Sequence, residues 1–240
     1  MTVYGRNACR ALAERRPGDV LRAFLTEERV GEFGPLLRHL ARRRSPYRVV
    51  GPEELERISG SWHHEGICLV AKLPQAPNPE ELATGPGPAR VLALAGVSNP
   101  HNLGAIVRTA AHFGARCVLT EGGSGRLPPA AWRTAEGGAE WVPVLRGRLP
   151  ALLAPFRGRG FRVIATSSHG GEDLFRAAMP ERVVFLLGAE GPGLPREALE
   201  AADLAVRIPG TGWVESLNVA TAAGILLAEA WRRHTEPRQG

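Results

Sequence analysis

Apolar runs of five to seven residues recur through the second half of the chain, and Ala-, Leu- and Arg-rich stretches of helical spacing lie between most of them. Runs that are apolar throughout and separated by helices are typical of a parallel sheet covered on both faces. We therefore predict an α/β domain with a mostly parallel sheet over residues 90–240, with ligand-binding loops beyond the carboxyl ends of its strands. The strands are expected at residues 91–97, 116–120, 141–145, 161–167, 182–188 and 204–210.

A smaller α/β pattern occupies residues 1–73. Short apolar runs there predict strands near residues 24–25, 47–50 and 67–73, and the spacing over residues 33–43 predicts a helix. Residues 74–89, PQAPNPEELATGPGPA, repeat Pro and Gly without a long apolar run, which is typical of a linker. The chain is thus predicted to contain a small front domain, a linker and a larger second domain.

The composition indicates a globular protein, since 44% of the 240 residues are hydrophobic and 22% are charged. The most apolar segment, residues 217–231, is interrupted by Asn218, Thr221 and Glu229, so it falls short of the ~20 apolar residues that span a bilayer. The N-terminus lacks the uninterrupted apolar core of a signal peptide. We expect a cytoplasmic protein with no membrane span.

The net charge of +6 is consistent with a polyanionic partner but does not require one. Residues 1–73 carry 13 basic and 9 acidic side chains and so hold most of the excess. The chain has 29 arginines and one lysine, Lys72. A coding sequence rich in G and C would produce that bias without a functional cause. The run Arg42, Arg43, Arg44 is equally open, because such a run forms either a solvated helix face or an RNA contact.

The three cysteines and seven histidines do not form a recognisable metal site or disulfide framework. Cys9, Cys68 and Cys117 are an odd number without CxxC spacing, and the adjacent His63 and His64 lack the spacing of a helical metal pair. We expect the cysteines to be small buried apolar residues and predict no bound metal.

Three polar or glycine-rich loops follow strands, in place of the common nucleotide and hydrolase fingerprints. The chain has no GxGxxG after its first long strand, no GxxxxGK[ST] and no GxSxG, which argues against a dinucleotide oxidoreductase, a P-loop NTPase and an α/β hydrolase. The loops that stand out are NPHNLGAIVRTAAHFG (99–114), LLGAEGPGLP (186–195) and IPGTGWVESLNVATAAGILLAEA (208–230).

Each loop by itself is also compatible with an ordinary strand-to-helix turn. In the first, Asn102 is expected to cap a helix, and Arg108 lies one turn after Gly104 on the same face. In the second, three glycines surround Glu190, where they allow close approach of the backbone to a ligand. In the third, a helix is expected to begin near Ser216.

Together, these loops resemble the three sequence motifs of the SpoU/TrmH family, the RNA ribose 2'-O-methyltransferases of the SPOUT superfamily. The resemblance covers residues 90–234, and YGRNACRAL (4–12) and HEGI (64–67) extend it to the family's small substrate-binding domain. NPHNLGAIVRTAAHFGA and RTAEGGAE are similar to the bacterial branch of tRNA or rRNA methyltransferases. The resemblance implies a trefoil-knotted second domain, which periodicity does not predict because knots are rare in protein chains.

The resemblance also implies a cofactor, partners and a reaction. The cofactor is S-adenosyl-L-methionine, whose methyl group is transferred to a ribose 2'-hydroxyl of rRNA or tRNA. Because the cofactor supplies the reactive group, the protein has mainly to bind, orient and manage charge. RNA and a second copy of the chain, forming a homodimer, are the implied partners, and the basic front domain is expected to contact the RNA. The implied cofactor-binding residues are Gly188, Ile208 and Leu217, with Thr166 as a further candidate.

The catalytic residues that the resemblance implies are Asn102, Arg108, Glu190, Ser216 and Asn218. An arginine side chain has no hydrogen-bond acceptor and stays protonated, so we expect Arg108 to grip an RNA phosphate and stabilise developing alkoxide charge. The alternative is that Arg108 itself draws away the hydroxyl proton. Glu190 is expected to orient Arg108 or a neighbouring loop, and Ser216 and Asn218 to position Arg108 or the target nucleotide.

One position departs from the family's common pattern, and two other functions compete with that of an RNA methyltransferase. Ala189 stands where many relatives have a polar residue, which weakens the prediction of activity only slightly because the loop is expected to act through its backbone and Glu190. A non-catalytic RNA-binding or assembly factor on the same scaffold is the main rival to an enzyme. An unrelated small-molecule α/β enzyme is the other, and it would have no RNA affinity.

Overall fold

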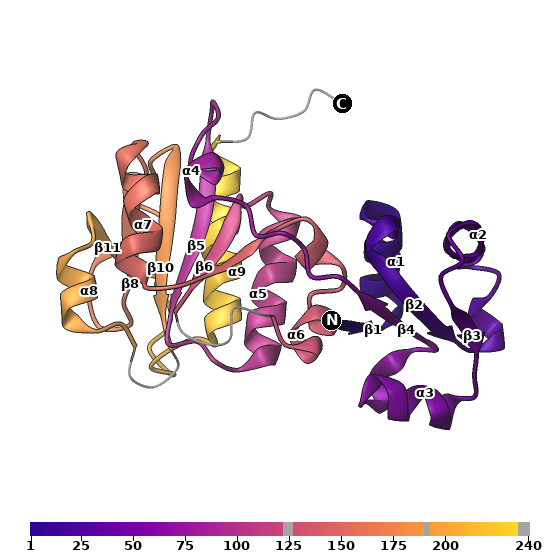
Figure 1. The fold of residues 1–240 in the computed structure, drawn as a ribbon. Helices are drawn as coiled ribbons and strands as arrows, with labels where there is room; N and C mark the ends of the chain where they lie inside the picture. Colours follow the sequence, from indigo (N-terminus) through magenta and orange to yellow (C-terminus); the bar gives the residue numbers. More distant parts are fainter. Residues whose placement is uncertain (122–126, 190–192, 235–240) are drawn as a thin grey trace, which may run out of the picture.

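The structure is a computed structural model that describes residues 1–121, 127–189 and 193–234. Two separate sheets form the cores of two domains, the front domain at the N-terminus and the larger second domain (Figure 1). The smaller sheet has the strand order β1-β4-β2-β3 and the larger one β7-β6-β5-β10-β8-β11-β9. The predicted division into two α/β units therefore has a direct counterpart in the two sheets.

The front domain packs three helices against a four-stranded mixed sheet. Helix α2 buries Leu36, Leu37 and Leu40, which recur at helical spacing and contact the core shared with Leu12 of α1. Strand β4 pairs antiparallel with β1 and β2, and β3 pairs parallel with β2. The strands are β1 (Thr2–Tyr4), β2 (Val20–Leu25), β3 (Tyr47–Val49) and β4 (Ile67–Ala71); the helices are α1 (Arg6–Arg15), α2 (Gly34–Arg42) and α3 (Pro52–Ser59), with 3-10 turns η1 (Pro17–Asp19), η2 (Glu27–Arg29) and η3 (Trp62–His64).

The front domain confirms the predicted strands and the predicted helix at residues 33–43. Arg42, Arg43 and Arg44 end that helix and are all exposed to solvent. The guanidinium of Arg43 donates a hydrogen bond to the carbonyl of Gly18, so one member of the run also ties α2 to the loop after α1.

All six strands predicted for the second domain are present, and all pairs within its sheet are parallel. A seventh strand, β9, is only two residues long and was not predicted, because so short a segment has no apolar run of its own. The strands are β5 (Ala89–Ala95), β6 (Cys117–Thr120), β7 (Val144–Arg146), β8 (Arg162–Thr166), β9 (Glu172–Asp173), β10 (Arg182–Gly188) and β11 (Leu204–Arg207). The trefoil knot stays a prediction.

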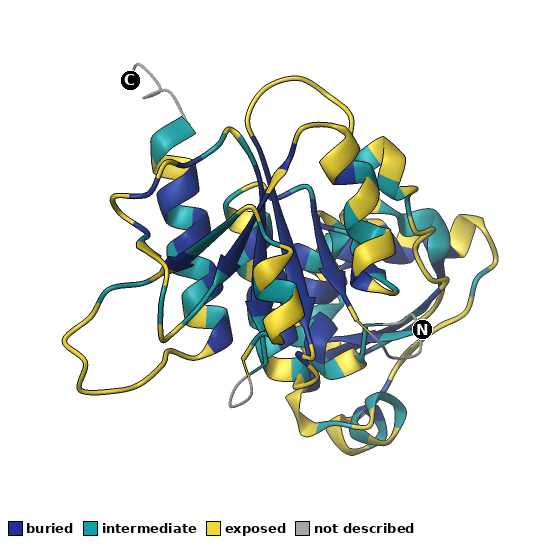
Figure 2. Ribbon diagram, turned by 90° about the vertical axis from the view of Figure 1, so that its left-hand side faces the viewer, coloured by how far each residue is buried: buried dark blue, intermediate teal, exposed yellow. Residues whose placement is uncertain are grey.

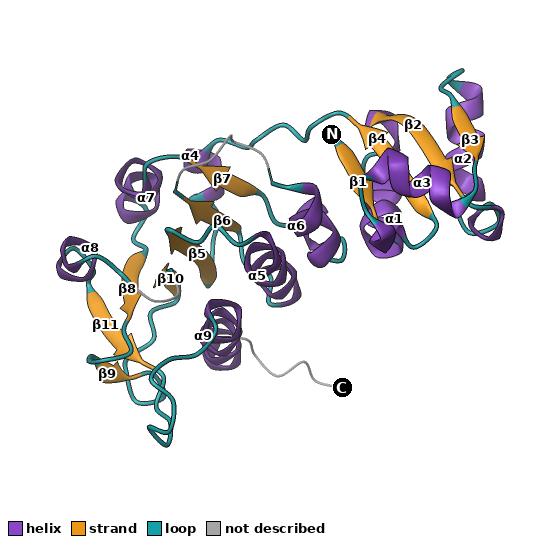
Figure 3. Ribbon diagram, turned by 90° about the horizontal axis from the view of Figure 1, so that it is seen from below, coloured by secondary structure: helices purple, strands orange, loops and turns teal. Residues whose placement is uncertain are grey.

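Helices cover both faces of this sheet, as its continuous apolar strands require (Figures 2 and 3). Along β5, Leu92 and Leu94 join the core under α5 and α9, whereas Val91 and Ala93 join the core under α7. The remaining elements are α4 (Pro79–Leu82), α5 (Pro100–His112), α6 (Pro129–Thr134), α7 (Leu149–Gly158), α8 (Arg196–Glu200), α9 (Val219–His234) and the 3-10 turn η4 (Gly138–Glu140).

The segment predicted as a linker is only partly one. Residues 72–78 carry no regular structure, but α4 follows, capped by the side chain of Asn78, and Ala83 is buried in the second domain. Arg116 donates to the carbonyl of Leu82 at 3.2 Å, and Arg182 donates to the carbonyl of Ala83 at 2.6 Å. The second half of the stretch 74–89 is therefore held against the second domain by two arginines that lie far away in the sequence.

The two domains touch through the end of α6 and η4. Gly137 has φ +89°, and a Cβ built on it would lie 2.7 Å from Cβ of Ala11 in α1. On the neighbouring Gly138 a Cβ would lie 3.1 Å from the Cα of Arg108 in α5. Two consecutive glycines thus let this segment lie against both α1 of the front domain and α5 of the second domain.

Candidate functional site

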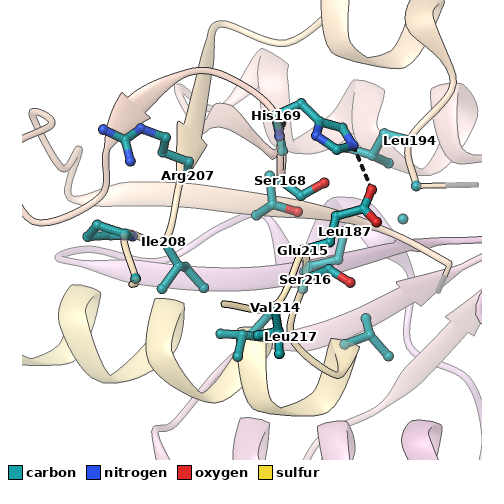
Figure 4. Close-up of a pocket in the computed structure, with 18 of the residues that line it drawn as sticks. Ser168, His169, Leu187, Leu194, Arg207, Ile208, Val214, Glu215, Ser216 and Leu217 are labelled. Carbon is teal, nitrogen blue, oxygen red and sulfur yellow. Dashed lines mark hydrogen bonds and ion pairs between the residues drawn. The ribbon is translucent and has the colours of Figure 1, made fainter. Parts of the chain in front are cut away.

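A cavity of about 660 Å³ lies at the carboxyl ends of strands β8, β10 and β11, and we call it the strand-end cavity (Figure 4). Its walls come from the loops that follow these strands, including residues 166–169, 187–189 and 207–217. Parallel strands bring their carboxyl ends to one edge, so loops that are far apart in the sequence meet there. A volume of this size is within the range of ligand pockets, roughly 300–1,000 Å³.

The four residues predicted to bind the cofactor, Thr166, Gly188, Ile208 and Leu217, all line this cavity. The predicted catalytic residue Ser216 lines it as well. The hydroxyl of Thr166 donates to the carbonyl of Leu186 at 3.1 Å, which ties the loop after β8 to β10. The structure therefore brings together residues from all three strand ends, although neighbouring strand ends are twenty or more residues apart in the sequence.

Gly188 occupies a position at which a side chain cannot be placed. A Cβ there would lie 2.2 Å from the carbonyl carbon of Gly193 and 2.5 Å from the nitrogen of Leu194. Both neighbours are backbone atoms of the same loop, and Ala189 forms an antiparallel bridge to Gly193. The wall of the cavity is here made of closely spaced backbone, which offers amide and carbonyl groups to a ligand.

The helix start predicted for the third motif is wrong by three residues. Helix α9 begins at Val219 and not near Ser216, so Ser216 and Leu217 lie in the loop before the helix. The side-chain oxygen of Asn218 accepts hydrogen bonds from the amides of Ala220 at 2.9 Å and Thr221 at 3.3 Å. Asn218 therefore caps α9. Ser216 does not serve as the cap and lies in the loop that lines the cavity.

Asn102 is also placed differently from its prediction. Asn99 caps α5, since its side chain accepts from the amide of His101 at 2.9 Å, and Asn102 lies within the first turn of the helix. The side-chain oxygen of Asn102 accepts a hydrogen bond of 3.0 Å from the side-chain amide of Asn218. Two predicted catalytic residues from motifs more than one hundred residues apart thus contact each other and join the starts of α5 and α9.

Arg108 lies apart from this group in the single chain. Its side chain is exposed, and it lines a second cavity between the two domains, not the strand-end cavity. Glu190 lies outside the described residues. Of the five predicted catalytic residues, the described chain therefore places Ser216 in the cavity and pairs Asn102 with Asn218, whereas Arg108 faces elsewhere.

The side chains of His169 and Glu215 meet at the mouth of the strand-end cavity, in a contact that the sequence did not predict. The Nε2 atom of His169 is 3.2 Å from Oε1 of Glu215, and both side chains line the cavity (Figure 4). His169 follows β8 and Glu215 follows β11, so the pair connects two loops across the opening. The position of His169 just after a predicted strand was the only signal that could have indicated it.

Metal ligation and cysteine chemistry have no support in the described part of the chain. No three His, Cys, Asp or Glu residues there come together in a group that could hold a metal ion. Cys9, Cys68 and Cys117 are free and buried, as predicted. Burial raises the pKa of the Cys68 and Cys117 thiols to about 12 in each case. No helix in the described residues is long and apolar enough to cross a membrane.

Two protein-family models match the chain, one for each domain. Residues 89–228 match the SpoU rRNA methylase family, and residues 2–77 match the family described as RNA 2'-O ribose methyltransferase substrate binding. Together the two matches leave out residues 78–88, which contain α4, and the two ends of the chain, which are Met1 and residues 229–240. They cover both sheets, and their boundary falls within the segment that joins them.

Relatives and solved structures agree with these matches. The chain is 41% identical over 97% of its length to an uncharacterized tRNA/rRNA methyltransferase, YfiF, of Escherichia coli O157:H7, and it covers 68% of that protein. It is 33% identical to a 23S rRNA (guanosine-2'-O-)-methyltransferase, RlmB, of Pseudomonas syringae, with 99% of this chain and 97% of that one covered. A crystal structure of an AdoMet-bound rRNA methyltransferase from Sinorhizobium meliloti matches with a TM-score of 0.80 and 25% identity, covering 98% of this chain and 88% of that one.

Proposed function

The chain belongs to the SpoU rRNA methylase family, and from this membership we propose how its own residues methylate RNA and which RNA they act on. It is an S-adenosylmethionine-dependent RNA methyltransferase that acts on a ribose 2'-hydroxyl. We propose ribosomal RNA as the substrate and the cytoplasm as its location. The support is the relative from Pseudomonas syringae, which carries both domains over almost its whole length and whose name specifies 23S rRNA.

The strand-end cavity is the proposed cofactor site. Thr166, Gly188, Ile208 and Leu217 line one cavity of suitable size, and Gly188 leaves the backbone of the β10 loop open to a ligand. This convergence of four predicted residues is the observation that carries the proposal. When bound there, S-adenosylmethionine supplies an electrophilic methyl group. The protein's part is to hold it in a fixed orientation, with the loops after β8, β10 and β11 around it.

On the substrate side, we assign the roles by charge and position. Arg108 offers a guanidinium without an acceptor, so it binds an RNA phosphate and stabilises the negative charge that develops on the ribose oxygen. Ser216 lines the cavity and positions the ribose. Asn102 and Asn218, through their 3.0 Å hydrogen bond, fix the starts of α5 and α9 relative to each other. Glu190 is assigned the orientation of the β10 loop or of Arg108.

A homodimer would unite these groups. Arg108 does not line the cavity of its own chain, so we propose that it reaches the strand-end cavity of a second copy. Trp213 and Val214, beside the cavity, are 90% and 71% exposed, and apolar side chains in such a loop are typical of an interface. Helix α9 carries small residues that allow close packing of a partner helix.

Methyl transfer to ribosomal RNA tests the activity. Purified chain, labelled S-adenosylmethionine and unmodified ribosomal RNA should yield RNA that resists alkaline cleavage at one labelled ribose. Arg108→Lys should lose about a hundredfold or more in rate, because it removes the guanidinium's two-pronged geometry. Equal rates for Arg108→Lys and the unaltered chain would contradict the role of Arg108. Cofactor binding without any transfer to RNA would favour a non-catalytic factor.

Mixing two inactive variants tests the shared site. Arg108→Ala removes the proposed phosphate ligand, and Gly188→Ala removes the proposed cofactor site. If Arg108 acts in the partner's cavity, mixed dimers contain one intact site each, and a random mixture should recover about a quarter of full activity. If Arg108 acts within its own chain, every dimer in the mixture lacks an intact site and no activity returns. Sedimentation of each variant checks that both still pair.

A further inference from the structure

A second cavity, also about 660 Å³, opens between the two domains, and we call it the interdomain cleft. Its walls are α1 of the front domain, α5 of the second domain and the segment from Ala135 to Trp141. The cofactor site does not use this cleft, since none of its lining residues also lines the strand-end cavity. Of the predicted catalytic residues that the structure describes, only Arg108 lines it, so a substrate that Arg108 contacts comes close to the cleft.

Trp141 presents a large and mostly exposed aromatic ring in the cleft. It is 60% exposed, and the guanidinium carbon of Arg15 lies 4.1 Å from its ring centroid. An indole with one cation against it and much of its surface in solvent is a platform on which a planar base can stack. Trp132 in the neighbouring helix α6 is by contrast buried.

The charges around the cleft fit a nucleotide better than a simple anion. Arg10 and Arg108 line it and suit the phosphates of a nucleic-acid backbone. Glu14 and Glu136 line it too, and they would repel a free anion. A carboxylate accepts hydrogen bonds from the amino group of a base such as cytosine. Arginines, carboxylates and an exposed indole together are therefore complementary to a phosphate-linked base that carries an amino group.

Two contacts across the domains hold the walls of the cleft. The side-chain amide of Asn7 donates to Oε2 of Glu136 at 2.6 Å, across the two domains. Gly137 lies so close to α1 that a Cβ on it would be 2.7 Å from Cβ of Ala11. A preformed site loses little conformational freedom on binding, which favours affinity for a single extruded nucleotide.

We infer that the interdomain cleft binds one unpaired nucleotide of the RNA substrate, with its base stacked on Trp141 and its phosphates next to Arg10 and Arg108. The inference rests on the proposed function and deepens it, because it names where a further nucleotide of the RNA is held, next to Arg108. Unpaired bases stacked on aromatic side chains are the usual way in which proteins recognise single-stranded RNA.

The test separates stacking from charge. A 12-nucleotide oligocytidylate and an abasic ribose-phosphate chain of the same length are titrated with the full chain, and their affinities are measured by fluorescence anisotropy. Trp141→Ala should weaken binding of the oligocytidylate about tenfold, which is the usual scale for one base stacked on an aromatic ring. It should leave the affinity for the abasic chain unchanged. Trp141→Phe keeps an aromatic face and should recover most of the loss.

Trp62→Ala is the matched control, because Trp62 is 64% exposed and lies in η3, outside the cleft. It should change neither affinity by more than about twofold. The inference is overturned if Trp141→Ala binds oligocytidylate like the unaltered chain, if it weakens both probes equally, or if Trp62→Ala has the same effect. Oligocytidylate binding that depends on Trp141, without methylation of ribosomal RNA, would instead refute the proposed function alone.

Discussion

Arg16 and Glu140 join the two domains through a two-pronged ion pair. Nε of Arg16 donates to Oε2 of Glu140 at 2.7 Å, and Nη2 donates to Oε1 at 3.0 Å. The side chain of Glu140 is only 2% exposed. Burial lowers the pKa of Arg16, but the hydrogen bonds and charge attraction from Glu140 and Asp19 together more than offset this, and the pKa is raised. The pair therefore holds the end of α1 to η4 in a partly desolvated interface.

Removing one partner of this pair should destabilise the protein substantially. In Arg16→Met the buried carboxylate of Glu140 loses its counter-charge, and we expect the free energy of unfolding to fall by about 3 kcal/mol. Urea denaturation followed by circular dichroism measures it. Glu200→Gln is the control, since it breaks the exposed Arg196–Glu200 pair and should cost less than about 0.5 kcal/mol. Equal losses in the two variants would refute the interface role of Arg16.

Gly137→Ala should separate the domains as well as destabilise the fold. The substitution places a methyl group 2.7 Å from Cβ of Ala11 and strains a backbone at φ +89°. Gly60→Ala is a close match, because Gly60 has φ +73° but nothing within 4 Å of the new methyl group. Backbone strain alone should cost about 1–2 kcal/mol in both. Only Gly137→Ala should also speed limited proteolysis in the exposed residues 72–78, and equal proteolysis rates would count against the clash.

Gly188→Ala should weaken cofactor binding by more than about tenfold. The added methyl group meets backbone atoms of Gly193 and Leu194 at 2.2–2.5 Å, so the loop that forms the cavity wall must move. Calorimetric titration with S-adenosylhomocysteine, the demethylated product, measures the affinity. Gly158→Ala, whose new methyl group meets nothing within 4 Å at the end of α7, should bind normally. Unchanged affinity in Gly188→Ala would place the cofactor elsewhere.

Stability should decline at alkaline pH because all three thiols are buried. Desolvation raises the ordinary thiol pKa of 9.0 to about 12 for Cys68 and for Cys117, and it raises the pKa of Cys9 well above that ordinary value. Between these values the unfolded chain has released protons that the native chain still holds, so the free energy of unfolding falls as pH rises, by about 1.4 kcal/mol per pH unit for each thiol. Urea midpoints from pH 8 to about 11 measure the slope. Cys117→Ala should reduce the slope, and an identical slope would contradict this origin.

The strands of the larger sheet were predictable because their signals are local. Each of them except β9 has an apolar run of its own. That Gly188, Ile208 and Leu217 bind the cofactor was expected only from the resemblance of the three motifs, and it stays a prediction. Helix starts were less predictable. Asn99 and Asn102 are both good capping residues only three positions apart, and the choice of Asn99 depends on where β5 ends and α5 begins.

What the sequence by itself determined is the strands of the larger sheet other than β9, the division into two α/β units, and the family that the three motifs resemble. These depend on residue type and spacing within short segments. Only the tertiary structure decided that Asn102 pairs with Asn218, that His169 meets Glu215 at the cavity mouth, and that Arg108 lies in the interdomain cleft. The physical reason is that such contacts join segments far apart in the chain, and their partners are set by how the sheet and the two domains pack, not by any residue's immediate neighbours.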